Sequence, residues 1–248
     1  MSPPILQAKR LNKNFGGLRA VGQVTFDVDP LGVTSIIGPN GAGKTTLFNL
    51  LSGLYIPDEG QLLMNGEDIT QLDPVARLSR GMARSFQITN LFFDLTVQQN
   101  LQLASQKLES WSKLFYATSK SSLTLQRAQE LLEEFHLEAK KDEPAGALSH
   151  GEQRRLEIAV TMALRPKILL LDEPTQGMSQ GDTQETSQLI AQLAKNVTIL
   201  LIEHDVELVM DLSKHVIVMA QGEKIAEGNP RDVRSNPIVQ TAYFGDAA

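Results

Sequence analysis

The stretch that decides the fold of this chain is Gly38-Pro39-Asn40-Gly41-Ala42-Gly43-Lys44-Thr45-Thr46. It fits the pattern G-x-x-x-x-G-K-[ST], and its flanking residues provide the context that this pattern requires. The run before it, Val33–Ile37, is β-branched and apolar, which is typical of a buried strand. The leucines after it recur at helical spacing, at Leu47, Leu50, Leu51 and Leu54. The sequence therefore predicts a strand, a glycine-rich loop and the start of a helix.

This arrangement is suited to binding phosphate. The glycines let backbone N–H groups turn inward, and the N-terminus of the following helix adds positive potential. We expect residues 38–46 to surround the nucleotide, with Lys44 on the β- and γ-phosphates and the Thr45 hydroxyl on Mg²⁺. The alternative, a glycine turn with a surface lysine, is much less consistent with these surroundings. The sequence therefore predicts that the chain binds a nucleoside triphosphate.

Composition and charge exclude several classes of function. A chain of 248 residues can bury a full core, as one large domain or as a domain with an inserted lobe. Its net charge of −6 and its pI of about 5.3 argue against a general nucleic-acid partner. The chain has no cysteine, which excludes disulfides and thiolate metal sites. Residues 1–13 do not resemble a signal peptide, and no apolar run approaches the roughly 18 residues of a membrane span, so we expect any membrane association to be peripheral.

Strand patterns near the loop predict a second, antiparallel β layer. Apolar and polar residues alternate from residue 23 to residue 29, which is the pattern of a half-buried strand, and residues 5–11 and 61–64 are also expected to form strands. Phe15 lies in a turn-like stretch between two of these strands. An aromatic side chain there either stacks on a nucleotide base or packs in the core, and the sequence leaves both interpretations open.

From about residue 88 to residue 165, helical patterns replace strand patterns. Residues 123–137 place apolar side chains at helical spacing, and the polar and aromatic stretch before them holds the only tryptophan, Trp111. We therefore predict a single domain in which residues 1–87 and 166–248 form the nucleotide-binding core with its β layer. Residues 88–165 would form a helical lobe inserted into this core.

A second helix start follows the lobe, at Leu148-Ser149-His150-Gly151-Glu152-Gln153. Ser149 and Glu152 have the spacing of a capping box, which is worth about 1 kcal/mol to a helix start. A capped helix start beside a glycine is also a second anion site. Because the phosphate loop already surrounds its own nucleotide, we expect Ser149, Gly151 and Glu152 to contact the ATP of a neighbouring subunit.

Two acids end the apolar run Ile168–Leu171, which we predict to be a buried strand. Burying a charge is unfavourable unless the charge is paired or holds a metal. At the carboxyl end of a strand beside a phosphate loop, Asp172 is placed to hold Mg²⁺ and Glu173 to polarise an attacking water. The alternative is a helix cap, which the preceding phosphate loop makes less favoured.

A further strand, Val197–Ile202, is followed by His204. A lone histidine is usually an ordinary surface or cap residue. At the end of a second parallel strand, however, His204 would lie at the same rim as Lys44 and Asp172. Ligands of open α/β sheets bind at that rim.

These residues resemble the ATP-binding subunits of ABC transporters over nearly the whole chain. Residues 38–46 match the Walker A motif, residues 168–173 match Walker B with its catalytic glutamate, and residues 148–153 match the signature motif. The single-residue matches are Gln87 to the Q-loop, His204 to the switch histidine and Phe15 to the adenine-stacking aromatic. The resemblance implies that Gln87 and His204 act in catalysis together with Glu173, and that Gln87 also meets Mg²⁺.

The fold that the resemblance implies is α/β: a RecA-like P-loop NTPase core with an antiparallel β subdomain and an inserted α-helical subdomain. It implies ATP hydrolysis coupled to transport, with ATP and Mg²⁺, in a head-to-tail dimer with an identical or homologous ATP-binding subunit. The other implied partners are integral membrane permease subunits docking on the helical subdomain and, indirectly, a solute-binding protein, with no nucleic acid. The implied location is peripheral, at the cytoplasmic face of the inner membrane.

Two motifs depart from the family pattern. The usual Leu-Ser-Gly-Gly-Gln is Leu148-Ser149-His150-Gly151-Glu152 in this chain. Ser179 stands at the position of the D-loop aspartate. The departures at His150 and Glu152 leave open which side-chain atoms there face the nucleotide, and Ser179 leaves open the contacts across the dimer.

Finer details resemble one branch, the ATPases of branched-chain or hydrophobic amino acid importers. The matching stretches are residues 15–21, 151–159, 202–205 and 242–245. Related subunits serve urea or amide uptake, which is the alternative substrate class. A soluble ABC ATPase of DNA repair or translation is the alternative from another class, and a regulatory module that hardly hydrolyses ATP is a third. The presence of Glu173 and His204 argues against that third alternative.

Overall fold

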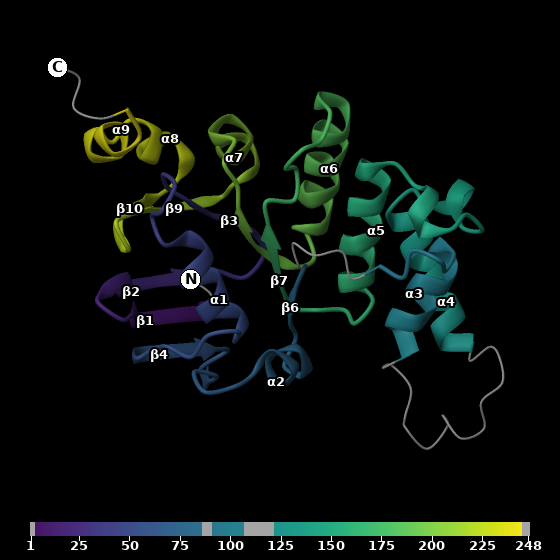
Figure 1. Cartoon of the computed structure of the whole chain (residues 1–248), viewed down its shortest axis with the longest axis horizontal. Helices are drawn as coiled ribbons and strands as arrows, with labels where there is room; N and C mark the ends of the chain where they lie inside the picture. The colour runs from purple at the N-terminus through teal and green to yellow at the C-terminus, as the bar shows by residue number, and fades with distance from the viewer. Residues whose placement is uncertain (1–2, 86–90, 107–121, 245–248) are drawn as a thin grey trace. The chain divides into compact units, whose positions relative to one another are not determined.

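The computed structural model of the chain describes residues 3–85, 91–106 and 122–244 (Figure 1). The chain divides into two compact units: a core unit of residues 1–83, 167–173 and 190–248, and a helical unit of residues 84–166 and 174–189. The helical unit thus includes residues 174–189, which we expected in the core. Within the helical unit, Arg155 forms an ion pair with Glu185 at 3.1 Å.

A six-stranded sheet, mostly parallel, runs through the core unit, with the order β10-β9-β3-β8-β7-β6. Its strands are β3 (Gly32–Ile37), β6 (Met82–Arg84), β7 (Ile168–Asp172), β8 (Thr198–Ile202), β9 (His215–Ala220) and β10 (Glu223–Gly228). Strand β3 pairs in parallel with β8 and β9, and β8 pairs in parallel with β7. Every residue of β7 and β8 is buried, so both faces of these strands are covered, as is usual for parallel strands.

A four-stranded antiparallel sheet forms a second layer of the core unit, in the order β2-β1-β4-β5. Its strands are β1 (Leu6–Phe15), β2 (Leu18–Val28), β4 (Glu59–Met64) and β5 (Glu67–Asp68). Its apolar face shares one hydrophobic cluster with helix α1 (Lys44–Ser52) and the parallel sheet, including Phe26, Leu62, Phe48 and Ile36. The predicted antiparallel β layer is confirmed.

The parallel sheet also carries helices on its other face. Helices α7 (Val206–Leu212), α8 (Pro230–Arg234) and α9 (Pro237–Phe244) lie on the side of β9 and β10 away from the antiparallel sheet (Figure 1). Strand β9 contributes Ile217 and Met219 to the first cluster, and Val216 and Val218 to a second cluster with residues of these helices. This alternation follows from the two-residue period of a strand.

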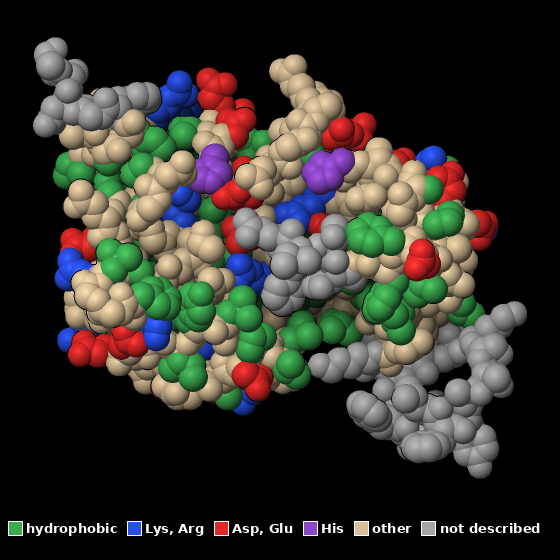
Figure 2. Space-filling model, viewed as in Figure 1, with side chains coloured by type: hydrophobic (Ala, Val, Ile, Leu, Met, Phe, Trp, Pro, Cys, Tyr) green, Lys and Arg blue, Asp and Glu red, His purple; other side chains and the backbone are tan. Residues whose placement is uncertain are grey.

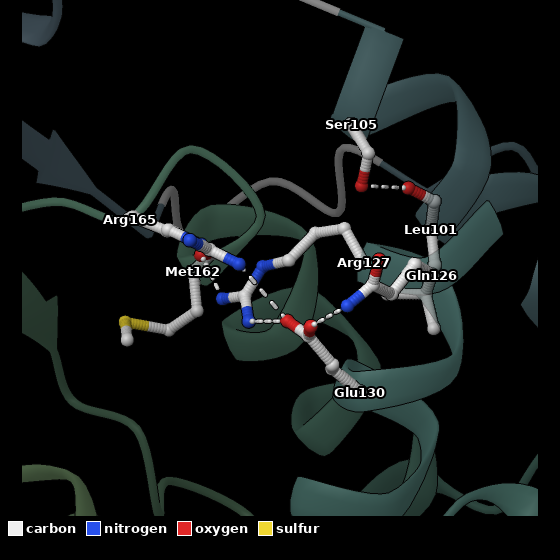
Figure 3. Close-up of polar contacts among 7 residues, drawn as sticks. All are labelled: Leu101, Ser105, Gln126, Arg127, Glu130, Met162 and Arg165. Atoms are coloured by element: carbon white, nitrogen blue, oxygen red, sulfur yellow. Dashed lines mark hydrogen bonds and ion pairs between the residues drawn. The ribbon is translucent and has the colours of Figure 1, made fainter. Parts of the chain in front are cut away.

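The helical unit contains α3 (Val97–Ser105), α4 (Ser122–Glu134), α5 (His150–Met162) and the first part of α6 (Gln180–Leu193), with 3₁₀ turns at Glu138–Lys140 and Ala145–Ala147. Buried Arg127 of α4 donates to the Met162 carbonyl at 2.8 Å, at the end of α5. Glu130 accepts hydrogen bonds at 3.1 Å from both Arg127 and Arg165 (Figure 3). These contacts join α4 to the end of α5.

No helix of the described residues is long and apolar enough to cross a bilayer.

Helix α1 stops at the only breaker in the leucine run, Gly53. It ends at Ser52, and Gly53 follows in the left-handed conformation with φ of 85°. A Cβ on Gly53 would lie 2.8 Å from the Leu72 carbonyl oxygen, so no other residue fits this turn without a shift. Leu54 therefore lies beyond the helix and is exposed.

Arg77 stabilises the end of α1 from helix α2 (Pro74–Ser79). Its guanidinium is buried and donates to the carbonyls of Leu50 and Leu51 at 2.5 and 2.7 Å. It also donates to the carbonyls of Leu72 and Thr70 at 2.9 and 3.0 Å. Burial lowers the pKa of Arg77 to about 10, so the group stays charged at neutral pH. A cation at this end also complements the negative end of the helix dipole.

We predict that Arg77→Met lowers the free energy of unfolding by about 2–4 kcal/mol, because several buried carbonyls lose their donor together. Urea denaturation followed by circular dichroism measures the change. Arg80→Met is the matched control, because Arg80 belongs to the same turn but makes an exposed ion pair with Glu67, worth about 0.5 kcal/mol. Equal urea midpoints for the two variants would contradict this role of Arg77.

Candidate nucleotide site

The parallel register of the sheet brings the ends of three strands to one rim. Ile36 of β3 lies opposite Ile202 of β8, and Asp172 of β7 lies opposite the same Ile202. The segments that follow these strands therefore begin side by side. They are the glycine-rich loop, Glu173 and the turn that carries His204.

The glycine-rich loop is held from behind by backbone groups. A Cβ on Gly38 would lie 2.2 Å from the Met219 carbonyl oxygen, and one on Gly43, with φ of 94°, would lie 2.3 Å from the Ala20 carbonyl oxygen. The backbone N–H of Gly222, in the turn between β9 and β10, donates to the Ala42 carbonyl at 3.0 Å. A side chain at either glycine would displace the loop from this support, which explains why glycine stands there.

Lys44 begins helix α1 and points into the loop. Its side chain is buried, and its Nζ donates to the carbonyls of Gly38 and Pro39 at 2.7 and 3.1 Å. Burial lowers the pKa of Lys44, while the negative charges of Glu173 and Asp172 act in the opposite direction. An ammonium that is held by two neutral carbonyls suits an anionic ligand.

The N-terminus of α1 is open to a ligand. Its N-cap is Gly43, which has no side chain to accept the first N–H groups of the helix. Thr45 is exposed and Thr46 is half-buried. Asn40 and Gly41 are exposed at the tip of the loop. A helix start without a side-chain cap, a hydroxyl and an ammonium together suit an anion.

Glu173 and His204 are in direct contact at the rim. The Oε1 atom of Glu173 lies 2.5 Å from Nε2 of His204, and the backbone N–H of Glu173 donates to the Ile202 carbonyl at 2.9 Å. Glu173 has φ of 46°, a costly conformation for a side chain of this size and one that is often found at functional sites. Asp172, the residue before it, is buried at the end of β7. The rim therefore carries a lysine, two acids and a histidine.

Phe15 does not pack in the core. It ends β1 with 44% of its surface exposed and forms an edge-to-face pair with Tyr55, with ring centroids 5.4 Å apart. The Nζ atom of Lys13 lies 5.8 Å from the centroid of the same ring. Of the two interpretations left open by the sequence, the structure thus removes core packing and leaves an exposed aromatic surface.

The start of α5 forms the predicted capping box. The Ser149 backbone N–H donates to Glu152 Oε2 at 2.8 Å, and the Glu152 N–H donates to Ser149 Oγ at 3.3 Å. The hydrogen bond from the Ser149 backbone lowers the pKa of Glu152. Gly151 is buried, and a Cβ there would lie 2.6 Å from Oδ1 of Asp182. Ser149 is the exposed member of this group, whereas Glu152 is committed to the cap.

The two departures from the family motifs also have structural partners. Nε2 of His150 lies 3.4 Å from the Gln176 carbonyl oxygen. The hydroxyl of Ser179 donates to Asp182 at 2.6 Å and accepts the Asp182 N–H, so Ser179 acts as a local cap beside the start of α6.

The predicted residues Gln87 and Trp111 lie outside the described residues. Tyr243, which has no predicted role in the site, forms a hydrogen bond with the backbone of Gly38.

Comparison with known proteins places this geometry in a family. A family model described as "ABC transporter" matches residues 21–176, and one described as "Branched-chain amino acid ATP-binding cassette transporter" matches residues 223–248. The chain is 42% identical to the high-affinity branched-chain amino acid transport ATP-binding proteins BraF of Pseudomonas aeruginosa and LivG of Escherichia coli K12, over 100% of both chains in each case.

Solved structures agree with these matches. The structure of the ADP conformation of MJ1267, an ATP-binding cassette of an ABC transporter, superposes with a TM-score of 0.87 at 33% identity. The match covers 99% of this chain and 100% of that one. The predicted fold and the resemblance on which it rested are confirmed. The chain belongs to the ABC transporter family, and within it to the ATP-binding proteins of branched-chain amino acid transport.

Proposed function

We propose that this chain hydrolyses ATP to energise the import of branched-chain or other neutral amino acids. The rim of the parallel sheet carries this proposal, because it brings the phosphate loop together with Glu173 and His204. The relatives that match over their whole length belong to high-affinity branched-chain amino acid transport, and they supply the substrate class. The sequence stretches that resemble amino acid importers favour the same class over urea or amides.

In this proposal, residues 38–46 hold the triphosphate and Phe15 stacks on the adenine. The Lys44 ammonium exchanges the carbonyls of Gly38 and Pro39 for the β- and γ-phosphates. This exchange is favourable because a hydrogen bond between two charged groups is about twice as strong as a neutral one. The exposed ring of Phe15 offers a base one open face, while Tyr55 contacts its edge.

The residues present fit a magnesium ion. Mg²⁺ prefers oxygen ligands and is usually held by one or two protein groups together with phosphate oxygens. Exposed Thr45 at the start of α1 and the carboxylate of Asp172 at the end of β7 are such groups. We propose them as ligands, with Gln87 as a third. When bound, the ion would neutralise charge that develops on the phosphate oxygens.

We propose that Glu173 is the general base and that His204 orients it. A general base must be within reach of the attacking water, and the carboxylate of Glu173 is fixed at the rim by the 2.5 Å contact to His204. His204 leaves 46% of its side chain exposed, so its ring is also accessible to the γ-phosphate. The proton of the attacking water would pass to the Glu173 carboxylate.

A second copy or a homologous subunit would complete the site. We propose a head-to-tail dimer in which the partner's signature segment contacts the ATP held by this chain. Exposed Ser149 at the start of α5 supports this contact, since its hydroxyl lies at a helix N-terminus. Gly151 and Glu152 would support the position of Ser149. The assembly would lie at the cytoplasmic face of the inner membrane, and a solute-binding protein would act indirectly through the permease.

The helical unit offers an apolar surface for the permease. From the sequence we expect the apolar stretch Leu91–Phe93 to be exposed on this unit. Phe92 and Phe93 are 57% and 44% exposed, as expected, whereas Leu91 is buried. The Asn100 side chain accepts the Phe92 N–H at 2.9 Å and donates to the Phe92 carbonyl at 3.0 Å, which fixes the backbone at this point. Exposed hydrophobic side chains also gather on the face of this unit shown in Figure 2. We propose that short cytoplasmic helices of the permease dock here.

We predict that Glu173→Gln keeps ATP binding but slows hydrolysis by about 10²–10⁴-fold, which is the usual contribution of a general base. The amide has nearly the same shape as the carboxylate, but it cannot accept the proton of water. Steady-state phosphate release measures the rate, and calorimetry measures binding. Light scattering should then show a dimer that forms only with ATP. Hydrolysis near the wild-type rate would contradict the role assigned to Glu173.

Uptake by whole cells tests the transport function itself. We expect that deleting this chain removes uptake of labelled leucine but not of labelled urea, and that wild type, but not Glu173→Gln, restores it. Loss of urea uptake alone would contradict the substrate class. Unchanged uptake of both solutes would contradict a role in importing either of them and favour an ABC ATPase not linked to transport.

We predict that Phe92→Ser with Phe93→Ser leaves ATP hydrolysis by the isolated chain unchanged but abolishes uptake and co-purification with the permease. Buried aromatic anchors at an interface are each worth about 2 kcal/mol or more. Leu123→Ser is the matched control, because Leu123 is 59% exposed on α4. A double variant that assembles and transports normally would place the docking surface elsewhere.

A further inference from the structure

The C-terminal helix α9 contacts the phosphate loop through Tyr243. Burial raises the pKa of Tyr243 to about 12, and a hydrogen bond with the Gly38 backbone acts in the opposite direction. A bond that favours the phenolate must be donated to its oxygen, because a phenolate has no proton to donate. The Gly38 N–H therefore donates to the Tyr243 hydroxyl oxygen.

Gly38 is thus held through both of its peptide groups. Its N–H donates to Tyr243, while its carbonyl accepts the Lys44 ammonium at 2.7 Å. Its Cα is pressed against the Met219 carbonyl of β9, where a Cβ would lie at 2.2 Å. The exchange proposed for Lys44 involves the Gly38 carbonyl, whereas the bond to Tyr243 involves the Gly38 N–H and the contact with β9 involves its Cα. Tyr243 therefore supports the loop in the state that receives nucleotide.

Helix α9 is itself fixed to the strand that leads into the loop. Val239 of α9 is buried in the cluster that contains Ile37, the residue before Gly38. Tyr243, one helical turn after Val239, packs against the same cluster. The hydroxyl is therefore presented by a packed helix and needs little further ordering to accept the Gly38 N–H.

We propose that Tyr243 is a positioning residue that holds the phosphate loop in its nucleotide-binding shape through the Gly38 amide. This inference rests on the proposed role of residues 38–46 in binding ATP. A group held in place before binding reduces the entropy lost on binding and so raises affinity. Without the hydroxyl, the buried Gly38 N–H loses its acceptor, and the loop must shift to satisfy it.

The test is Tyr243→Phe in the full-length chain. We expect the Kd for ADP, measured by calorimetry, to rise about 3- to 10-fold, the value of one hydrogen bond. The KM for ATP should rise by a similar factor, while kcat at saturating ATP and the melting temperature change little. ADP is the probe because it is not hydrolysed and still occupies the loop.

Val239→Ala separates this role from packing. It removes apolar volume from the same helix but keeps the hydroxyl, so we expect a lower melting temperature and an unchanged Kd. The inference is overturned if Tyr243→Phe leaves the Kd unchanged, or if both variants lose affinity in proportion to their loss of stability. Lys44→Ala serves as the reference for the proposed function. If Lys44→Ala binds ADP like wild type, the assignment of the loop fails, and the inference about Tyr243 fails with it.

Discussion

The site depends on the parallel register of β3, β8 and β7. Ile36 and Asp172 both lie level with Ile202, so the loop, the acids and the histidine leave the sheet at the same height. A slip of one residue in β8 would turn each of its side chains to the opposite face. It would also move His204 along the strand by about 3.3 Å, which breaks the 2.5 Å contact between His204 Nε2 and Glu173 Oε1. The buried apolar side chains on both faces of β7 and β8 oppose such a slip, so hydrophobic packing fixes the positions of the proposed catalytic groups.

Hydrogen bonds and nearby charges stabilise the buried lysine of the glycine-rich loop. Burying an ammonium is unfavourable unless it is paired or hydrogen-bonded. Lys44 meets this need through two carbonyls of its own loop and through the nearby charges of Asp172 and Glu173. The loop therefore supplies hydrogen-bond partners for its own lysine. Arg77 serves the opposite end of the same helix, where it satisfies carbonyls rather than N–H groups.

Local patterns predicted the phosphate loop, the strands that flank it and the capping box at Ser149, because each is specified by neighbours in sequence. The prediction that His204 lies at the same rim as Lys44 and Asp172 followed from a general rule: ligands of open α/β sheets bind at the carboxyl ends of the parallel strands. Contacts between distant segments left no such pattern: nothing near Arg77 shows that it reaches the end of α1, and nothing near Tyr243 shows that it reaches Gly38. The end of α1 lies at Gly53, the only breaker in the leucine run, although Leu54 continues the leucine spacing. Leu91 was expected at the surface because it shares a short apolar stretch with Phe92 and Phe93, but only the two aromatic side chains are exposed.

The capping box also explains how the unusual signature segment can still serve an anion. Glu152 accepts the Ser149 N–H and also bonds to the Ser149 side chain, and both bonds lower the pKa of Glu152. An ionised carboxylate at this helix start repels a second anion, which disfavours phosphate near Glu152 itself. The Ser149 hydroxyl can rotate, however, and exchange the carboxylate for a phosphate oxygen without loss of the cap, since Glu152 keeps the backbone N–H. Because one charge-assisted hydrogen bond replaces another, the exchange requires little energy. In the proposed dimer, glutamate in place of glutamine is therefore compatible with a phosphate contact that is made by Ser149.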